Sequence, residues 1–221
     1  MTKSVIALLK KDLLLEWRER HAISGIILYV VSTVFVCYLS IGIKSSKINP
    51  PTWNALLWII LLFASVNAVA KSFLQEKSGR LLYYYTIASP QAIIVSKIIY
   101  NTVLLVVLSS IAYFFYSIVL GNPVEDKLLF FSTFLLGAIG FATTFTMISA
   151  IASKADNSST LMAILGFPVI IPMLLMLMKV SKAAIDGLAF SVSVDELIIL
   201  GALNVMMIAL AYILFPYLWR N

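Results

Sequence analysis

The amino-acid sequence predicts an all-α integral membrane protein, and two observations support this prediction. Of the 221 residues, 62% are hydrophobic and 12% are charged, whereas a soluble domain is roughly half apolar and about a quarter charged. The apolar residues form long blocks rather than an alternating pattern, which favours spanning helices over a β-barrel. The loops between blocks are short, so we expect residues 1–221 to form a single membrane domain.

Six apolar blocks are long enough to be transmembrane helices. A helix needs about 20 mostly apolar residues to cross a bilayer. The blocks lie at residues 22–43, 53–70, 93–120, 128–152, 160–178 and 197–218. Aromatic residues near the start of the second block, Trp53 and Trp58, and at the end of the sixth, Tyr217 and Trp219, are predicted to belong to an aromatic belt at the membrane interface.

The distribution of Lys and Arg predicts the orientation, because short cytoplasmic loops are enriched in these residues. With the N-terminus inside, eleven of the sixteen basic residues are cytoplasmic. The five outside are Lys44, Lys47, Lys127, Lys179 and Lys182. An even number of spans then places both termini in the cytoplasm. Since the basic residues flank apolar blocks, topology and lipid headgroups explain the net charge of +6 better than nucleic acid does.

Residues 1–21, which read MTKSVIALLKKDLLLEWRERH, are predicted to form an amphipathic helix in the membrane interface. Their apolar residues recur at helical spacing, at Ile6, Leu9, Leu13 and Trp17. A charged leader that only sets the topology is the alternative interpretation.

Polar side chains inside the predicted spans are candidates for a cavity or a helix interface. Such groups normally face another helix or a cavity. They are Asn67, Asn101, Thr143, Thr144 and Asn204. The fourth block also carries Ala142, Thr146 and Ala150 at intervals of four, which allows close helix approach. Helix packing is the main interpretation, and substrate contact is the alternative.

The fifth block contains Pro168 and Pro172, each of which removes a backbone hydrogen-bond donor. We expect a kink there, which serves either static packing or a hinge. The segment that follows, residues 180–196, is amphipathic and is predicted to form a short helix lying at the outer surface.

Catalytic and metal-binding patterns are not found in the sequence. His21 is the single histidine. No His, Cys, Asp and Glu residues have metal-ligand spacing, and no phosphate-binding loop or nucleophile elbow occurs. We therefore expect no enzyme activity and no directly bound cofactor. A protein that moves or rearranges something must then receive its energy from a partner.

Residues 71–92 are the predicted cytoplasmic connection between the second and third spans, and they carry a family resemblance. The stretch FLQEKSGRLLYYYTIASPQAIIVSK, from Phe73 to Lys97, resembles the coupling segment of ABC-2-type exporter membrane subunits. An acidic–basic–x–Gly run is followed by a helical stretch and a Ser-Pro pair. The matching residues are Glu76, Lys77, Gly79, Leu81, Leu82, Ser89 and Pro90. Residues 1–21 are similar to the interfacial elbow helix of such exporters.

Within that group the whole chain resembles the haem exporter protein B family. The resemblance rests on the length, the single six-span unit, three stretches of sequence and one residue. The stretches are LLKKDLLLEWRER, SGRLLYYYTIASP and, in the fifth span, FPVIIPMLL, and the residue is Lys97 in the third span. The chain departs from the family pattern at LLYYYTIASP, where a Leu-rich run is more usual.

The resemblance implies a membrane subunit of the cytochrome c maturation ABC transporter, in a bacterial inner membrane. A separate ABC ATPase subunit would bind ATP, and a haem-handling membrane protein would be a further partner. Because ABC motors act in pairs, a two-fold homodimer is the expected assembly. Haem is the implied cargo, and whether haem itself moves or ATP releases a haem-loaded chaperone stays open. The alternatives are an ABC-2 permease for a lipid, drug or polysaccharide, and a non-transport scaffold.

The connection between the second and third spans is predicted to contact the ATPase. Gly79 permits a turn and Pro90 ends the segment. Tyrosines combine a large contact area with a polar end, as binding hot spots often do. The predicted contact residues are Glu76, Gly79, Leu81, Leu82, Tyr83, Tyr84, Tyr85, Ser89 and Pro90. An interfacial belt of tyrosines is the alternative, although it leaves the Gly and the Ser-Pro pair unexplained.

Overall fold

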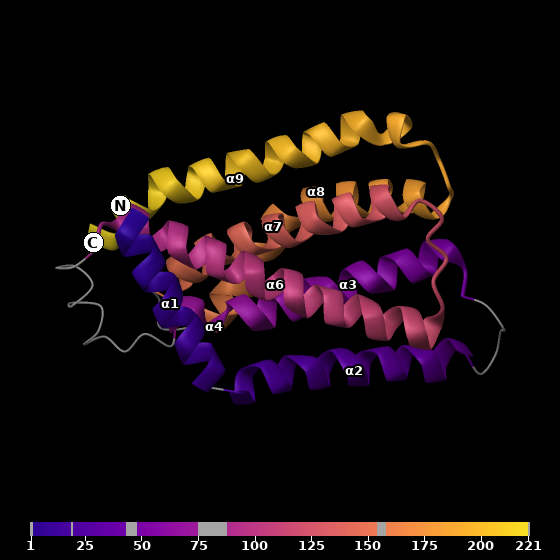
Figure 1. Ribbon diagram of the computed structural model, residues 1–221, viewed down its shortest axis with the longest axis horizontal. Coiled ribbons are helices and arrows are strands. Elements are labelled where there is room, and N and C mark those ends of the chain that lie inside the picture. Colours follow the sequence, from indigo (N-terminus) through magenta and orange to yellow (C-terminus); the bar gives the residue numbers. More distant parts are fainter. Residues whose placement is uncertain (1, 19, 43–47, 75–87, 154–157, 221) are drawn as a thin grey trace.

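Helices make up nearly all of the part of the chain that the structure describes. This structure is a computed structural model, and it describes residues 2–18, 20–42, 48–74, 88–153 and 158–220 (Figure 1). No strand occurs within these ranges. In chain order the elements are α1 (Thr2–Arg18), α2 (Arg20–Gly42), α3 (Pro50–Val69), α4 (Lys71–Leu74), α6 (Pro90–Leu120), α7 (Lys127–Ala152), α8 (Ser158–Ile185), the short 3-10 helix η1 (Phe190–Ser193) and α9 (Val194–Arg220).

Five of the described helical stretches are long and apolar enough to cross a membrane. They lie at Pro50–Val69, Pro90–Leu120, Lys127–Ala152, Ile164–Ile185 and Phe190–Leu218, and so coincide with the second to sixth predicted spans. The first predicted span corresponds to α2, whose described apolar part, Ser24–Ser40, is shorter. The prediction of an all-helical membrane protein is confirmed, with five membrane-capable helices.

The starts of two long helices follow from local sequence signals. The side chain of Ser89 caps α6, and Pro90 occupies the first turn, where no backbone donor is needed. Asp126 caps α7 by accepting the backbone N–H of Leu129 at 3.0 Å. Gly121 ends α6 with a φ of 80°, a conformation that favours glycine.

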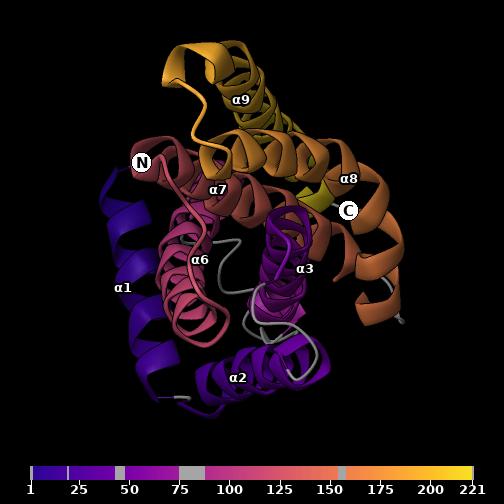
Figure 2. The same ribbon diagram turned by 90° about the vertical axis from the view of Figure 1, so that its right-hand side faces the viewer.

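Helix α7 is the central helix of the bundle (Figure 2). It packs against α3, α4, α6, α8 and α9. Within its most apolar window 67% of the residues are buried, against 17% for the stretch containing α9. Glycines permit this close packing, because a Cβ at Gly137 would lie 2.8 Å from the ring of Trp58. The small residues at intervals of four, Ala142, Thr146 and Ala150, are all buried. In the structure they therefore contribute to the packing of α7 against its neighbouring helices.

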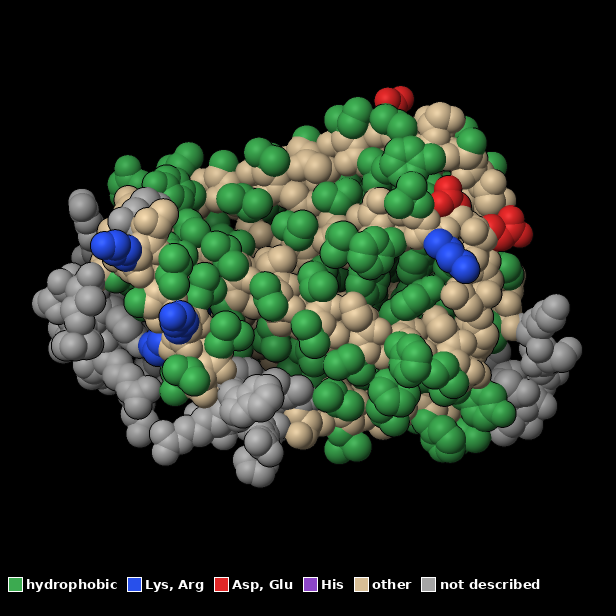
Figure 3. All heavy atoms as spheres, in the orientation of Figure 1, with side chains coloured by type: hydrophobic (Ala, Val, Ile, Leu, Met, Phe, Trp, Pro, Cys, Tyr) green, Lys and Arg blue, Asp and Glu red, His purple; other side chains and the backbone are tan. Residues whose placement is uncertain are grey.

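The face of the bundle seen in Figure 3 is apolar along its middle and carries charged side chains toward its ends. Hydrophobic side chains cover the face in view, and the basic side chains of α1 lie at one end. Lys3 and Lys10 are exposed on α1, whereas Glu125 and Asp186 are exposed at the opposite end. This distribution is the one expected for a bundle that spans a bilayer.

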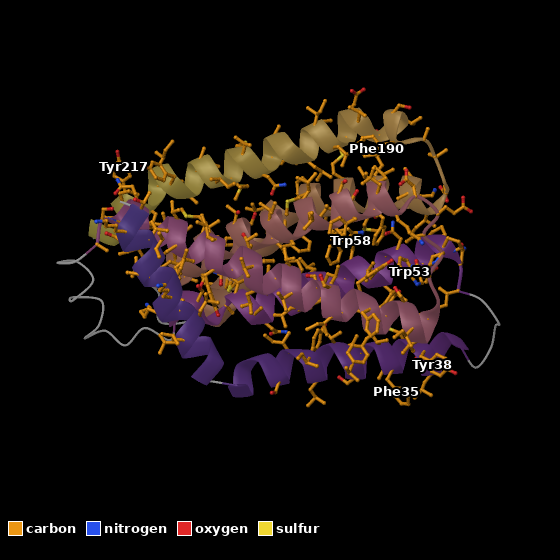
Figure 4. All side chains as sticks on the ribbon, in the orientation of Figure 1. Phe35, Tyr38, Trp53, Trp58, Phe190 and Tyr217 are labelled. Carbon is orange, nitrogen blue, oxygen red and sulfur yellow. The ribbon has the colours of Figure 1, made fainter. Side chains whose placement is uncertain are left out.

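Trp53 and Trp58 do not form the predicted aromatic belt. Both side chains are only 1% exposed, and Figure 4 shows them inside the bundle, whereas Phe35 and Tyr38 lie along the outer side of α2. Trp53 donates its indole N–H to the carbonyl of Gly121 at 2.9 Å. The belt prediction is wrong for Trp53 and Trp58, because the helix that carries them packs against α6, α7 and α8, and the indole donors find partners there.

The predicted outer segment at residues 180–196 does not form one separate surface helix. Helix α8 continues to Ile185, because Val180, Ser181 and Ala184 are buried. The rest of the segment forms a turn, η1 and the first turn of α9.

Candidate functional site

The elements predicted to be cytoplasmic gather at one end of the bundle. Figure 1 shows the N-terminus, α4 and the C-terminus at the same end. Seven of the nine predicted coupling residues, Glu76, Gly79, Leu81, Leu82, Tyr83, Tyr84 and Tyr85, lie outside the described residues. The structure describes what holds the two ends of this loop. We refer to Ala70 with α4 as the leading anchor, and to Ser89 with Pro90 as the trailing anchor.

Hydrogen bonds join the leading anchor to α6 and α7. Asn101 of α6 donates to the hydroxyl of Ser72 in α4 at 3.0 Å and to the hydroxyl of Thr146 in α7 at 2.8 Å. Ser149 of α7 donates to the carbonyl of Ala70 at 3.2 Å. A polar group in apolar surroundings is costly unless it is hydrogen-bonded. Asn101 therefore links three helices at the point where the chain leaves α3.

Phe73 inserts the leading anchor into a small hydrophobic cluster of its own. The buried members of this cluster are Phe73, Ile93, Ile94, Ile98, Met147, Ala150, Ala211 and Phe215. The rings of Phe73 and Phe215 lie 5.6 Å apart. The cluster is separate from the main core, and it joins α4 to α6, α7 and α9.

A buried ion pair lies beside this cluster. Lys97 of α6 and Asp12 of α1 are each 6% exposed, and the Lys97 Nζ lies 3.4 Å from the Asp12 Oδ1. The same Nζ lies 5.7 Å from the centre of the Phe73 ring, within the range of a cation–π contact. Lys11 also pairs with the Asp12 Oδ1, at 3.0 Å.

Asp12 is the residue at this end that the sequence reasoning missed. Residues 2–18 form the helix α1, and two of its predicted apolar residues, Ile6 and Leu13, are exposed rather than packed on the bundle. Asp12 faces inward, where its Oδ1 pairs with Lys97 of α6 and with Lys11 of its own helix. An ionisable residue inside a predicted span needs a partner of opposite charge. The position of Lys97 in the third predicted span therefore indicates that an acidic residue such as Asp12 lies near it.

The other predicted polar residues divide into buried and exposed positions. Asn204 of α9 is buried and donates to the carbonyl of Leu136 in α7 at 3.2 Å. Thr143 and Thr144 are fully buried in α7. Asn67 is exposed on α3. The structure therefore brings Asn101 and Asn204 into contacts between helices and leaves Asn67 on the outside of the subunit.

The two candidate hinge prolines lie within one continuous helix, since α8 extends through both Pro168 and Pro172. The residue before the first proline, Phe167, packs edge-on against Phe63 of α3, with ring centres 6.0 Å apart. Gly166 lies close to α7, because a Cβ there would meet the Phe145 ring at 3.2 Å. Among the described residues no group of three His, Cys, Asp or Glu side chains could hold a metal ion.

Comparison with known proteins identifies the family. The family described as CcmB protein matches residues 3–218, which include α1, both anchors and all five membrane-capable helices. The chain belongs to the CcmB protein family. CcmB proteins are haem exporter membrane subunits of ABC transporters in cytochrome c biogenesis, and they work with an ATPase subunit. No curated protein matches the chain.

Proposed function

We propose that the chain is the permease subunit of an ABC exporter complex that exports haem, or releases a haem-loaded chaperone, for the biogenesis of c-type cytochromes. In this proposal a separate subunit hydrolyses ATP, and the chain itself binds no cofactor. The observation that supports it is the attachment of the leading anchor to α6 and α7 through Asn101 and Ser149. A force applied to the loop would reach two long helices directly.

The loop between α4 and α6 is the proposed ATPase contact. Its proposed contact residues are Glu76, Gly79, Leu81, Leu82, Tyr83, Tyr84, Tyr85, Ser89 and Pro90. The trailing anchor supports this proposal, because the cap at Ser89 starts α6 at a fixed residue and carries any displacement of the loop into a 31-residue helix. Pro168 and Pro172 are the proposed hinge in α8.

The proposed assembly is a homodimer of six-span subunits in a bacterial inner membrane, with two ATPase subunits and a haem-handling membrane protein. Helix α2 is the proposed first span, since it packs against α3 and α6 and runs beside them in Figure 1. Lys3, Lys10 and Lys11 lie on α1 and favour a cytoplasmic location for that end and both termini.

Purification of the native complex tests this function. We expect an ABC ATPase and a haem-handling membrane protein to co-purify, and mass spectrometry identifies them. We also expect deletion of the chain to abolish covalent haem staining of c-type cytochromes. An ATPase partner combined with normal cytochromes would indicate a permease for another cargo, such as a lipid, a drug or a polysaccharide. A complex without any ATPase would indicate a scaffold.

A further inference from the structure

We propose that Asp12 and Lys97 are positioning residues, whose ion pair makes α1, α4 and the first turns of α6 move as one unit. The inference rests on the proposed function, because it assigns this unit the task of carrying displacement of the ATPase contact into the membrane. Both residues lie within the described part of the chain, and the predicted contact residues do not include them.

Asp12 attaches α1 to the bundle together with Leu8, which packs against the hydrophobic cluster around Phe73. Among the α1 side chains that the structure describes, residues 2–15, Asp12 is the only one that is buried. Its apolar neighbours Leu8 and Leu9 are partly buried, while Ile6 and Leu13 are more than half exposed. Exposed apolar residues fit the predicted position of α1 in the membrane interface, where they would face lipid. The side chain that lies most deeply against the protein is a carboxylate.

The buried carboxylate of Asp12 has two cationic partners among the described residues, and Lys97 is the one that comes from another helix. Removing a charge from water costs free energy unless a partner of opposite charge is close. Lys97 is such a partner, because its Nζ lies 3.4 Å from the Asp12 Oδ1. It belongs to α6, which begins at Pro90, far from Asp12 in the sequence. Lys11 contacts the same oxygen from the more exposed side. Loss of the Asp12 charge would leave Lys97 buried without this counter-charge.

The pair also connects α1 to the leading anchor. Lys97 lies over the ring of Phe73, and one helical turn later Asn101 donates to the neighbouring Ser72. Two residues of α6 spaced by one turn therefore bind two successive residues of α4. Because Lys97 contacts both Asp12 and Phe73, displacement of α4 is transmitted to α1 as well as to α6.

The first arm of the test measures the position of α1 without any partner. A nitroxide is attached to Lys10→Cys in a Cys37→Ser background, and its mobility is recorded by electron paramagnetic resonance in liposomes. We expect Asp12→Asn and Lys97→Met to mobilise the label, and the reversed pair Asp12→Lys with Lys97→Asp to restrict it again. Should the single variants fail to insert, the reversed pair still carries the test. Unchanged mobility in the single variants overturns the inference.

The second arm measures coupling in the purified complex. We expect Asp12→Asn and Lys97→Met to retain the ATPase subunit while the cytochrome c yield per ATP hydrolysed falls about tenfold, a usual size for coupling between sites. The reversed pair should restore the yield. If the pair had only a structural role, the variants would lower the amount of complex but not the cytochrome c yield per ATP hydrolysed. An unchanged yield per ATP contradicts the inference.

The matched control is the ion pair at the opposite end of the bundle, between Lys179 and Glu196 at 2.9 Å. Its lysine is 66% exposed, so Lys179→Met and Glu196→Gln should leave label mobility and cytochrome yield unchanged. The two arms also separate this inference from the proposed function. If the unsubstituted complex holds no ATPase, the proposed function fails, whereas the mobility arm still decides whether the pair fixes α1.

Discussion

Trp58 of α3 donates its indole N–H to the hydroxyl of Ser181 in α8, at a distance of 2.8 Å inside the bundle. Ser181 in turn lies 2.7 Å from the side-chain oxygen of Asn54, whose amide donates to the carbonyl of Met178. Three side chains therefore satisfy one another at the end of the bundle away from α1. Each bond joins α3 to α8.

We predict that Ser181→Ala lowers the free energy of unfolding by about 1–2 kcal/mol, because it leaves the Trp58 donor buried without its partner. Thermal unfolding of the purified protein in detergent measures the change. The control is Ser110→Ala, since Ser110 is exposed and donates to the carbonyl of Val106 in its own helix. Equal unfolding of the two variants would show that this polar group adds no stability.

Gly137→Ala should destabilise the protein by about 1–3 kcal/mol through overpacking. The added Cβ would lie 2.8 Å from the rigid Trp58 ring and 3.2 Å from Leu177. Gly201→Ala is the matched control, because nothing lies within 4 Å of a Cβ there. The midpoint of thermal unfolding compares the two. A Gly137 variant as stable as the Gly201 variant would mean that α3 and α8 shift freely around α7.

Asn101→Leu should weaken retention of the ATPase subunit, since it removes the bonds from α6 to Ser72 and Thr146 and releases the leading anchor. We expect a loss of about 1 kcal/mol in stability as well, the usual size for bonds between helices in membranes. Asn67→Leu is the control, because Asn67 is exposed on α3. Co-purification yield measures the effect, and equal retention by both variants would contradict it.

Replacing Tyr83, Tyr84 and Tyr85 with Ala should release the ATPase subunit from the detergent-solubilised complex without reducing membrane insertion. Large aromatic side chains carry much of the binding energy at protein interfaces. The control is Tyr38→Ala, an exposed tyrosine on α2. If the ATPase stays bound to the triple variant with unchanged ATP turnover, the proposed contact is wrong.

Replacing Pro168 and Pro172 with Ala should raise the stability of α8 and lower the cytochrome c yield. Each substitution restores a backbone donor inside the helix, so the helix becomes stiffer. The control is Pro216→Ala, which does the same inside α9. Thermal unfolding and haem staining measure the two effects. A normal yield from the stiffened α8 would remove the hinge proposal.

Much of the helical architecture could be predicted from the sequence, because apolar blocks of membrane length are a local property. The Ser89–Pro90 pair likewise marks the start of α6 to within a few residues. The end of the fifth span was placed too early, since α8 continues to Ile185. That extension depends on Ser181 meeting Trp58 and Asn54, which belong to a distant part of the chain.

The site was less predictable, because its contacts join residues far apart in the sequence. Asp12 and Lys97 are separated by 85 positions, and helical periodicity within α1 places Asp12 among the polar residues. Trp53 and Trp58 are of the residue type that forms interfacial belts, yet both are buried because α3 packs against α8. The sequence predicts that Asn101 faces a cavity or another helix, but spacing along the chain does not identify its partners Ser72 and Thr146.

The central position of α7 has a consequence while the protein is being synthesised. Segments nearer the N-terminus are made and fold first, so α7 enters the bilayer before α8 and α9 exist to cover it. Two of its threonines do not need those later helices: Thr133 donates to the carbonyl of Leu129 at 2.8 Å, and Thr143 to that of Ile139 at 2.9 Å. The hydroxyls are satisfied within their own helix, so the nascent α7 can remain in lipid until its neighbours are made.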